Sequence, residues 1–232
     1  RPSFLSSTTM PLILPLPGAV ALIAYLVLAW RFGALWRGHV PPFADHPLRE
    51  QGVVGGVLAL HGLALALPGI GLLNMGVGEA VSLVAWLTIG LHWAIRWCYR
   101  LEGLQWPLML MGAMGCAAAL VLPASYTHGL TASPALALHI IVSLMGYSLF
   151  LLAAMMAGLM LVIEKRLHAR NLKRLPVKLP PLLKLESLLF QTLGVALALL
   201  TVTVVTGTAF SEAIFGRPFA LTHKSVFSFV SW

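Results

Sequence analysis

Residues 135–163 read ALALHIIVSLMGYSLFLLAAMMAGLMLVI, a run that contains no Asp, Glu, Lys or Arg. A helix needs about 20 mainly apolar residues to cross the hydrocarbon core of a bilayer, and this run is longer than that. Glu164, Lys165 and Arg166 follow it directly and extend the helix out of the lipid. The run therefore predicts a transmembrane helix, which satisfies its own backbone hydrogen bonds inside the membrane.

The whole chain shares this apolar character. Of its 232 residues, 59% are hydrophobic and 9% are charged, and the mean hydropathy is +0.91. A soluble domain carries about 25% charged residues. The composition therefore excludes a water-soluble globular enzyme, a disordered chain and a nucleic-acid-binding module as first interpretations.

Further apolar runs outside 135–163 predict more membrane helices, at 11–30, 52–68, 77–95, 104–122 and 188–209. A seventh run begins at residue 225 and stops at Trp232, which is too short to span. We expect an all-α polytopic transmembrane helix bundle with six complete spans and a truncated seventh. Residues 1–9 are interpreted as a polar leader ahead of Met10, a candidate true start, and residues 10–232 as one membrane domain that is truncated at its C-terminal end.

The basic residues predict the orientation. The net charge of +8 comes from 15 Lys and Arg against 7 Asp and Glu. Twelve of the 15 fall in alternate loops: Arg31, Arg37, Arg49, Arg96, Arg100, Lys165, Arg166, Arg170, Lys173, Arg174, Lys178 and Lys184. The positive-inside rule places these loops in the cytoplasm and the N-terminus outside. The excess charge thus indicates the lipid bilayer as a partner, and no nucleic acid.

His139 carries the most informative surroundings of the histidines. It lies about one turn inside the outer end of the fifth predicted helix, and His139, Ser143 and Tyr147 follow one another at four-residue spacing. A neutral imidazole at the outer membrane boundary suits axial ligation of haem iron. The alternative is an interfacial histidine that is hydrogen-bonded to a neighbouring helix.

His61 is predicted near the bilayer centre, within the second span, where an ionisable side chain is a functional hypothesis by default. An interhelical hydrogen bond is the alternative here too. His92, beside Trp93 and Arg96, is interpreted as an interfacial anchor. His128 and His223 fall in loops on the outer side, the side of His139.

The sequence shows no motif typical of an enzyme. It contains no nucleotide-binding glycine loop, no H-E-x-x-H and no pair of carboxylates within a span. Cys98 and Cys116 form no C-x-x-C-H haem-attachment motif. We therefore expect neither a hydrolase nor an ATP-driven pump, and no enzyme.

Two stretches resemble a known family. Residues 127–148, THGLTASPALALHIIVSLMGYS, resemble the start of the core domain of cytochrome c assembly proteins of the CcsA/CcmC/HemX type. Residues 179–190, LPPLLKLESLLF, continuing to 200–207, LTVTVVTG, are similar to the YpjD-like inner-membrane branch of that family. A weaker match is LHGL at 60–63 followed by LNM at 73–75.

The resemblance implies an eight-helix bacterial inner-membrane protein that binds or presents haem. It would assist cytochrome c assembly or haem homeostasis together with other cytochrome c maturation proteins. His139 matches the family's external haem ligand and His61 its membrane-embedded ligand, so both are candidate ligands of haem iron. His128 and His223 match less specific positions, and Tyr147 belongs to the same candidate haem-binding set.

One loop departs from the family pattern. Haem-ligating members carry a tryptophan-rich loop ending in Trp-Asp, whereas residues 210–224 hold Phe210, Phe215 and Phe219 and neither Trp nor Asp. Two alternatives therefore stand beside haem binding. One is a small-solute or metal-ion transporter that uses His61 and His139 as a path, and the other is a membrane scaffold that has lost haem binding.

Overall fold

The computed structural model describes residues 16–37, 46–66, 76–99, 101, 103–122, 134–168, 181–209, 211–212, 226–227, 229–230 and 232. The regular structure in these ranges is helical, and they contain no strand. The helices are α1 (Leu16–Phe32), the short 3-10 helix η1 (Leu35–Arg37), α2 (Pro47–Ala66), α3 (Val77–Ile95), α4 (Gln105–Val121), α5 (Pro134–His168) and α6 (Leu182–Ala209). The predicted all-α class is confirmed for the described residues.

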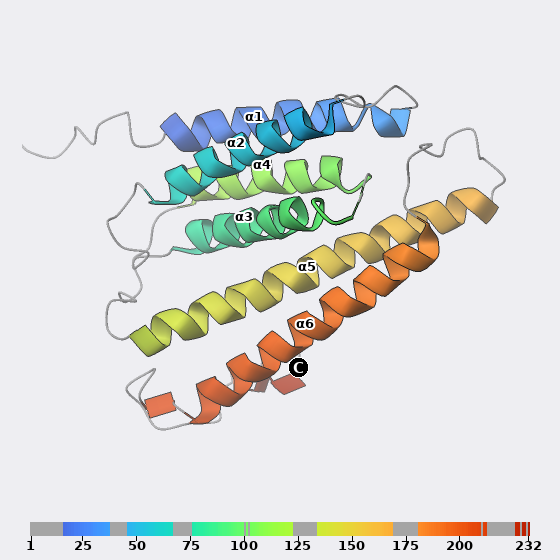
Figure 1. Ribbon diagram of the computed structural model, residues 1–232. Coiled ribbons are helices and arrows are strands. Elements are labelled where there is room, and N and C mark those ends of the chain that lie inside the picture. The colour runs from blue at the N-terminus through green and yellow to red at the C-terminus, as the bar shows by residue number, and fades with distance from the viewer. Residues whose placement is uncertain are drawn as a thin grey trace, which may run out of the picture.

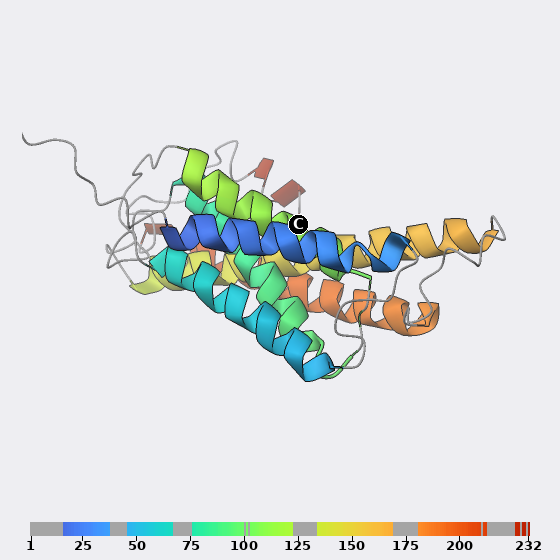
Figure 2. The ribbon, with the colours of Figure 1, turned by 90° about the horizontal axis from the view of Figure 1, so that it is seen from above.

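Successive long helices run in opposite directions and form two groups (Figure 1). Helices α1 to α4 pack together, with α4 and α2 on the two sides of α1 (Figure 2). Helices α5 and α6 form a long pair that joins the first group where α3 packs on α5. Among the described elements, α6 therefore depends mainly on α5 for its place.

The predicted count of six spans is supported in part. Three described helices are long and apolar enough to cross a membrane, namely α3, α5 and α6. Helices α1 and α4 are apolar but have 17 residues each, and α2 has 20 residues, of which Arg49, Glu50 and Gln51 in its first turns are polar. The truncated seventh run is not confirmed, because only residues 226–227, 229–230 and 232 are described there.

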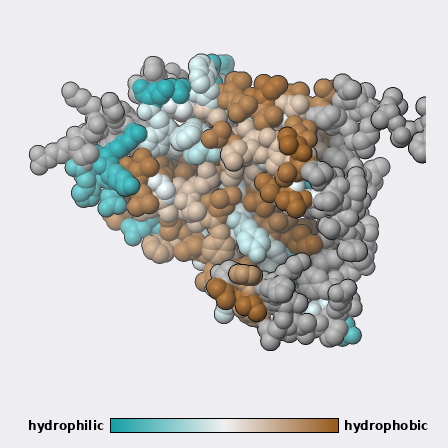
Figure 3. All heavy atoms as spheres, turned by 180° about the vertical axis from the view of Figure 1, so that it is seen from behind, coloured by the Kyte–Doolittle hydropathy of each residue, from teal (hydrophilic) through white to brown (hydrophobic). Residues whose placement is uncertain are grey.

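The outer surface of the bundle is apolar over most of its length. On α6, large apolar side chains such as Phe190, Val195, Val202 and Val205 are exposed. Figure 3 shows hydrophobic residues over much of the coloured part of one face, with most hydrophilic residues toward one end. Such an extensive exposed apolar surface fits lipid as the surrounding solvent.

One end of the bundle, called the basic end below, holds the C-terminal ends of α1, α3 and α5 and the N-terminal ends of α2, α4 and α6 (Figure 1). Its described basic residues are Arg31, Arg37, Arg49, Arg96, Lys165, Arg166 and Lys184. Cation–π contacts help to order this end, since Arg166 lies 4.8 Å from the ring centroid of Trp36 and Lys184 lies 5.1 Å from that of Tyr99. The opposite end holds the N-termini of α1, α3 and α5.

Two helices begin earlier than the apolar runs predicted. Helix α2 begins at Pro47 instead of 52, and α6 begins at Leu182 instead of 188. In α2 the additional turn is held by Glu50 and Gln51, which are buried against neighbouring helices. The apolar pattern marks the part of a helix that lies in lipid, whereas the helix itself continues through polar residues that find partners.

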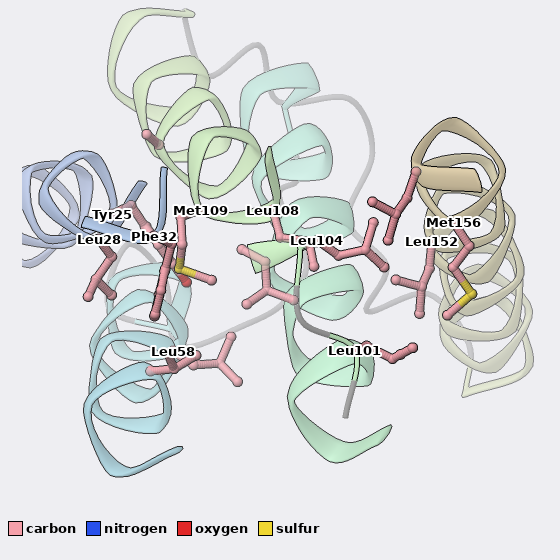
Figure 4. Close-up of a cluster of buried hydrophobic side chains, with 14 of the residues drawn as sticks. Tyr25, Leu28, Phe32, Leu58, Leu101, Leu104, Leu108, Met109, Leu152 and Met156 are labelled. Atoms are coloured by element: carbon pink, nitrogen blue, oxygen red, sulfur yellow. The ribbon is translucent and has the colours of Figure 1, made fainter. Parts of the chain in front are cut away.

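A buried apolar cluster joins the two helix groups (Figure 4). Tyr25 of α1, Leu58 of α2 and Leu108 of α4 belong to it, and Leu152 and Met156 extend it onto α5. Lipid tails are as apolar as these side chains, so close packing rather than hydrophobic transfer has to hold such helices together inside a membrane.

Glycines permit the closest helix contacts. A Cβ atom at Gly78 of α3 would lie 2.6 Å from the carbonyl oxygen of Ala118 on α4. A Cβ atom at Gly115 of α4 would lie 2.8 Å from the Cβ atom of Ala85 on α3. Two glycines, one from each helix, therefore set the spacing between α3 and α4.

A Gly78→Ala variant is expected to lower the melting temperature in detergent, with a cost of about 1–3 kcal/mol, because backbone atoms of α4 have to move. Gly56→Ala is the matched control. A Cβ atom there meets nothing within 4 Å, so the better helix propensity of alanine leaves stability equal or slightly higher. Equal melting temperatures for Gly78→Ala and the unmodified chain would contradict this packing.

Candidate functional site

His139 lies near the start of α5, at the end of the bundle opposite the basic end, and faces α6. Its Nδ1 atom is 3.1 Å from the hydroxyl oxygen of Thr206. That hydroxyl donates its own proton to the carbonyl of Val202 on the preceding turn, at 2.7 Å. In the tautomer that carries its proton on Nδ1, His139 donates to Thr206 and the imidazole lone pair lies on Nε2.

A glycine on α6 leaves room for this ring. A Cβ atom at Gly207 would lie 3.1 Å from Cε1 of His139, a distance at which either the ring or α6 has to shift. The His139 ring is half-buried. The sequence pair Thr206-Gly207 thus supplies both the hydrogen bond and the space for the imidazole.

Ser143 continues the polar contact between α5 and α6. Its hydroxyl donates to the His139 carbonyl at 2.6 Å and lies 3.4 Å from the hydroxyl oxygen of Thr203. Tyr147 follows four residues later and is 49% exposed. Each four-residue step rotates a helix position by about 40°, so the predicted polar stripe turns progressively, with His139 and Ser143 in contact with α6 and Tyr147 toward the surface.

His61 lies in a different part of the molecule, inside the group formed by α1 to α4. Its Nδ1 atom is 3.2 Å from the hydroxyl of Tyr25 and its Nε2 atom is 2.9 Å from the hydroxyl of Ser82. The rings of Tyr25 and His61 meet edge to face at 5.4 Å between centroids. With 1% of its surface exposed, His61 connects α1, α2 and α3 through hydrogen bonds.

The two histidines differ in how they fit a haem ligand. His139 is held at Nδ1 with its ring half-buried, an arrangement typical of histidines that ligate a metal through Nε2. His61 does not fit in the arrangement described, because both ring nitrogens are hydrogen-bonded in a packed core. Its ligation of iron stays a prediction that requires one of these bonds to break.

The remaining predicted site residues are not placed. His128 and His223 lie outside the described residues, as does the aromatic loop with Phe215 and Phe219. Within the described ranges, no group of three or more His, Cys, Asp or Glu side chains is arranged to hold a metal ion.

A buried charge cluster at the basic end was not predicted. The carboxylate of Glu50 on α2 pairs with Arg96 after α3 and accepts a hydrogen bond from the amide of Gln105 on α4. The side chains of Glu50 and Arg96 are each 10% exposed. The sequence contained a signal for this pair, because Glu50 lies just before the second predicted span and Arg96 directly follows the third. Arg96 was interpreted only as a marker of membrane topology.

His92 belongs to the same region, where the interpretation as an interfacial anchor is wrong. Its side chain is 3% exposed on the buried face of α3. Nε2 of His92, Oε1 of Gln51 and Nε of Arg96 are buried without a hydrogen-bond partner among the described residues. Ordered water is the usual partner of such atoms. The pattern of aromatic and basic neighbours indicated a surface position, but the helix turns His92 inward.

Comparison with known proteins gives a consistent result. A model of the family described as "Cytochrome C assembly protein" matches residues 56–232. The chain is 28% identical over 196 residues to "Inner membrane protein YpjD" of Escherichia coli strain K12, covering 79% of this chain and 71% of that protein. It is 23% identical over 153 residues to "Protein HemX" of Brevibacillus brevis, covering 65% of this chain and 56% of that protein. No solved structure matches.

A Glu50→Gln variant is expected to destabilise the protein by about 3–5 kcal/mol, because it leaves the Arg96 charge buried without its partner. The readout is the midpoint of thermal or denaturant unfolding in detergent. Glu164→Gln is the matched control, since Glu164 is exposed at the end of α5 and its replacement should change stability by at most about 0.5 kcal/mol.

The double variant Glu50→Gln/Arg96→Met removes both charges and should recover part of the lost stability. A double variant no more stable than Glu50→Gln would show that the ion pair is not what holds this end of the bundle.

Proposed function

Because the chain belongs to the cytochrome c assembly protein family, we propose that it binds or presents haem in a bacterial inner membrane. In this role it assists cytochrome c assembly or haem homeostasis by binding rather than by catalysis. The family match includes both His61 and His139. The name of the relative, inner membrane protein YpjD, supports the inner membrane as the location. Haem, the surrounding lipid and other cytochrome c maturation proteins are the partners in this proposal.

The observation that carries the proposal is the hydrogen bond between His139 and Thr206. This contact fixes the orientation of the ring, and a hydrogen bond donated by Nδ1–H goes with the tautomer that has its lone pair on Nε2. When bound, haem would supply an iron centre that a neutral imidazole nitrogen can ligate. His139 therefore serves as the ligand, and Thr206 and Gly207 position it.

His61 has a separate part in the proposal. It holds α1, α2 and α3 together through Tyr25 and Ser82, and its role as a second ligand or relay requires release of one of these hydrogen bonds. His128, His223 and Tyr147 remain candidate contributors on the outer side.

Six spans with the N-terminus outside complete the proposal, and a native cysteine offers a test. Cys98 is exposed just after α3 at the basic end, and Cys116 is buried. A membrane-impermeant maleimide should label Cys98 in inverted inner-membrane vesicles and leave it unlabelled in intact spheroplasts, because the basic end faces the cytoplasm. Cys98→Ser should abolish the labelling. Labelling in spheroplasts would reverse the proposed orientation.

For haem binding, the chain purified after expression with added haem precursor should show a Soret band that His139→Ala reduces several-fold. Free imidazole should restore part of the band in this variant, because it replaces the deleted ligand. His168→Ala is the matched control. His168 lies exposed at the other end of α5, so its loss should leave the band unchanged.

A colourless protein even with excess haem would contradict the proposal and favour the membrane scaffold. The role of His61 is tested in the same series. A folded His61→Ala variant with a weaker band supports ligation or relay, whereas a full band assigns His61 to structure alone. Melting temperatures of all variants separate loss of haem from loss of fold.

A further inference from the structure

A groove of about 510 Å³ lies at the basic end, far from His139 along α5. It is lined by η1, the start of α4 and the last turns of α5. The lining residues that matter below are Trp36, Trp106, Met155, Gly158, Val162 and Arg166. Its volume falls in the range of small-molecule binding sites, roughly 300–1,000 Å³. Neither haem ligation nor the buried charge cluster makes use of it.

The groove is apolar along its length and carries a cation. Arg166 is the charged side chain among its described lining residues. The guanidinium lies over the ring of Trp36 at 4.8 Å from the centroid. Trp36 in turn donates its indole N–H to the carbonyl oxygen of Gly103 at 3.2 Å. The ring that supports Arg166 is therefore fixed by the segment that precedes α4.

The groove opens to the surroundings of the bundle. Trp106 and Val162 on its walls are partly exposed, and a Cβ atom added at Gly158 would meet nothing within 4 Å. A groove that opens on the apolar side of a membrane helix is filled by lipid rather than by water. Tryptophan is also the residue that favours the level of the lipid headgroups.

We propose that this groove binds one phospholipid with an anionic headgroup. One acyl chain lies against Met155, Val162 and the ring of Trp106, and Arg166 binds the headgroup phosphate. The guanidinium of arginine presents paired N–H donors that match phosphate oxygens. The groove lies at the basic end of the bundle, where Arg37 follows the lining residue Trp36 in η1, and this charge favours an anionic over a zwitterionic lipid.

Bound lipid at this place has a structural consequence. It contacts η1 and α4 from the first helix group and α5 from the second. Since α5 joins the first group through α3 and the apolar cluster, the lipid adds a second connection at the basic end. The occupied groove should therefore stabilise the relative position of the two helix groups.

Native mass spectrometry of the purified chain in a neutral detergent tests the proposal. Phosphatidylglycerol or phosphatidylcholine with identical acyl chains is added, and the fraction of the chain that retains one lipid is measured. The unmodified chain should retain one phosphatidylglycerol at least about tenfold more readily than phosphatidylcholine. Gly158→Leu fills the groove and should abolish this retention. Arg166→Gln should bring the retention of phosphatidylglycerol down to that of phosphatidylcholine.

Matched controls separate the groove from general effects. Gly194→Leu places the same side chain where a Cβ atom also meets nothing within 4 Å, on α6, and Lys165→Gln removes the adjacent exposed charge. Both controls should retain phosphatidylglycerol as the unmodified chain does. Equal retention of the two lipids, or equal loss in Arg166→Gln and Lys165→Gln, would overturn the proposal. Arg166→Gln replaces a partly exposed side chain near the end of α5, so it tests the proposal even where Gly158→Leu fails to fold.

Discussion

The first helix group depends on the ion pair and hydrogen bond that the Glu50 carboxylate makes. This carboxylate comes from α2 and contacts Arg96 after α3 and Gln105 in the first turn of α4. Apolar helices gain little by leaving lipid for one another, so a bundle of this kind is specified by polar contacts and by close packing. A buried charge pair specifies such an arrangement strongly, because each ion is costly without the other.

The rest of the bundle uses neutral polar groups and small residues. Tyr25, His61 and Ser82 join three helices in the interior, and Gly78 and Gly115 bring α3 and α4 close together. Between α5 and α6, hydroxyls and the imidazole of His139 add polar contacts to the apolar packing. The polar contacts between α5 and α6 are thus neutral and weaker than the ion pair of Glu50. The end of this helix pair that carries His139 is the end at which we propose that haem binds.

Much of the fold, and part of the candidate site, could be predicted from the sequence alone. Charge-free runs predicted the helices, and alternate basic loops predicted which helix ends lie together. For His139 the sequence allowed two interpretations, haem ligation and an interhelical hydrogen bond. The structure shows the hydrogen bond to Thr206. This bond is also compatible with haem ligation, because it orients the ring. His92 was misplaced because a helical wheel shows which residues share a face and not which face meets a neighbour. Glu50 was overlooked because its partners, Arg96 and Gln105, are 46 and 55 residues away.

Apolar length and charge asymmetry in the sequence by themselves determined that this protein is a helical membrane protein with a basic end, since both follow from transfer free energies of individual residues. Family membership could likewise be recognised from residues in order along the chain. Only the tertiary structure decided that His61 is engaged at both nitrogens, that Nδ1 of His139 contacts Thr206, and that Glu50 is buried with Arg96. These properties depend on which helix faces meet, and that is set by packing and hydrogen bonds between residues far apart in the chain.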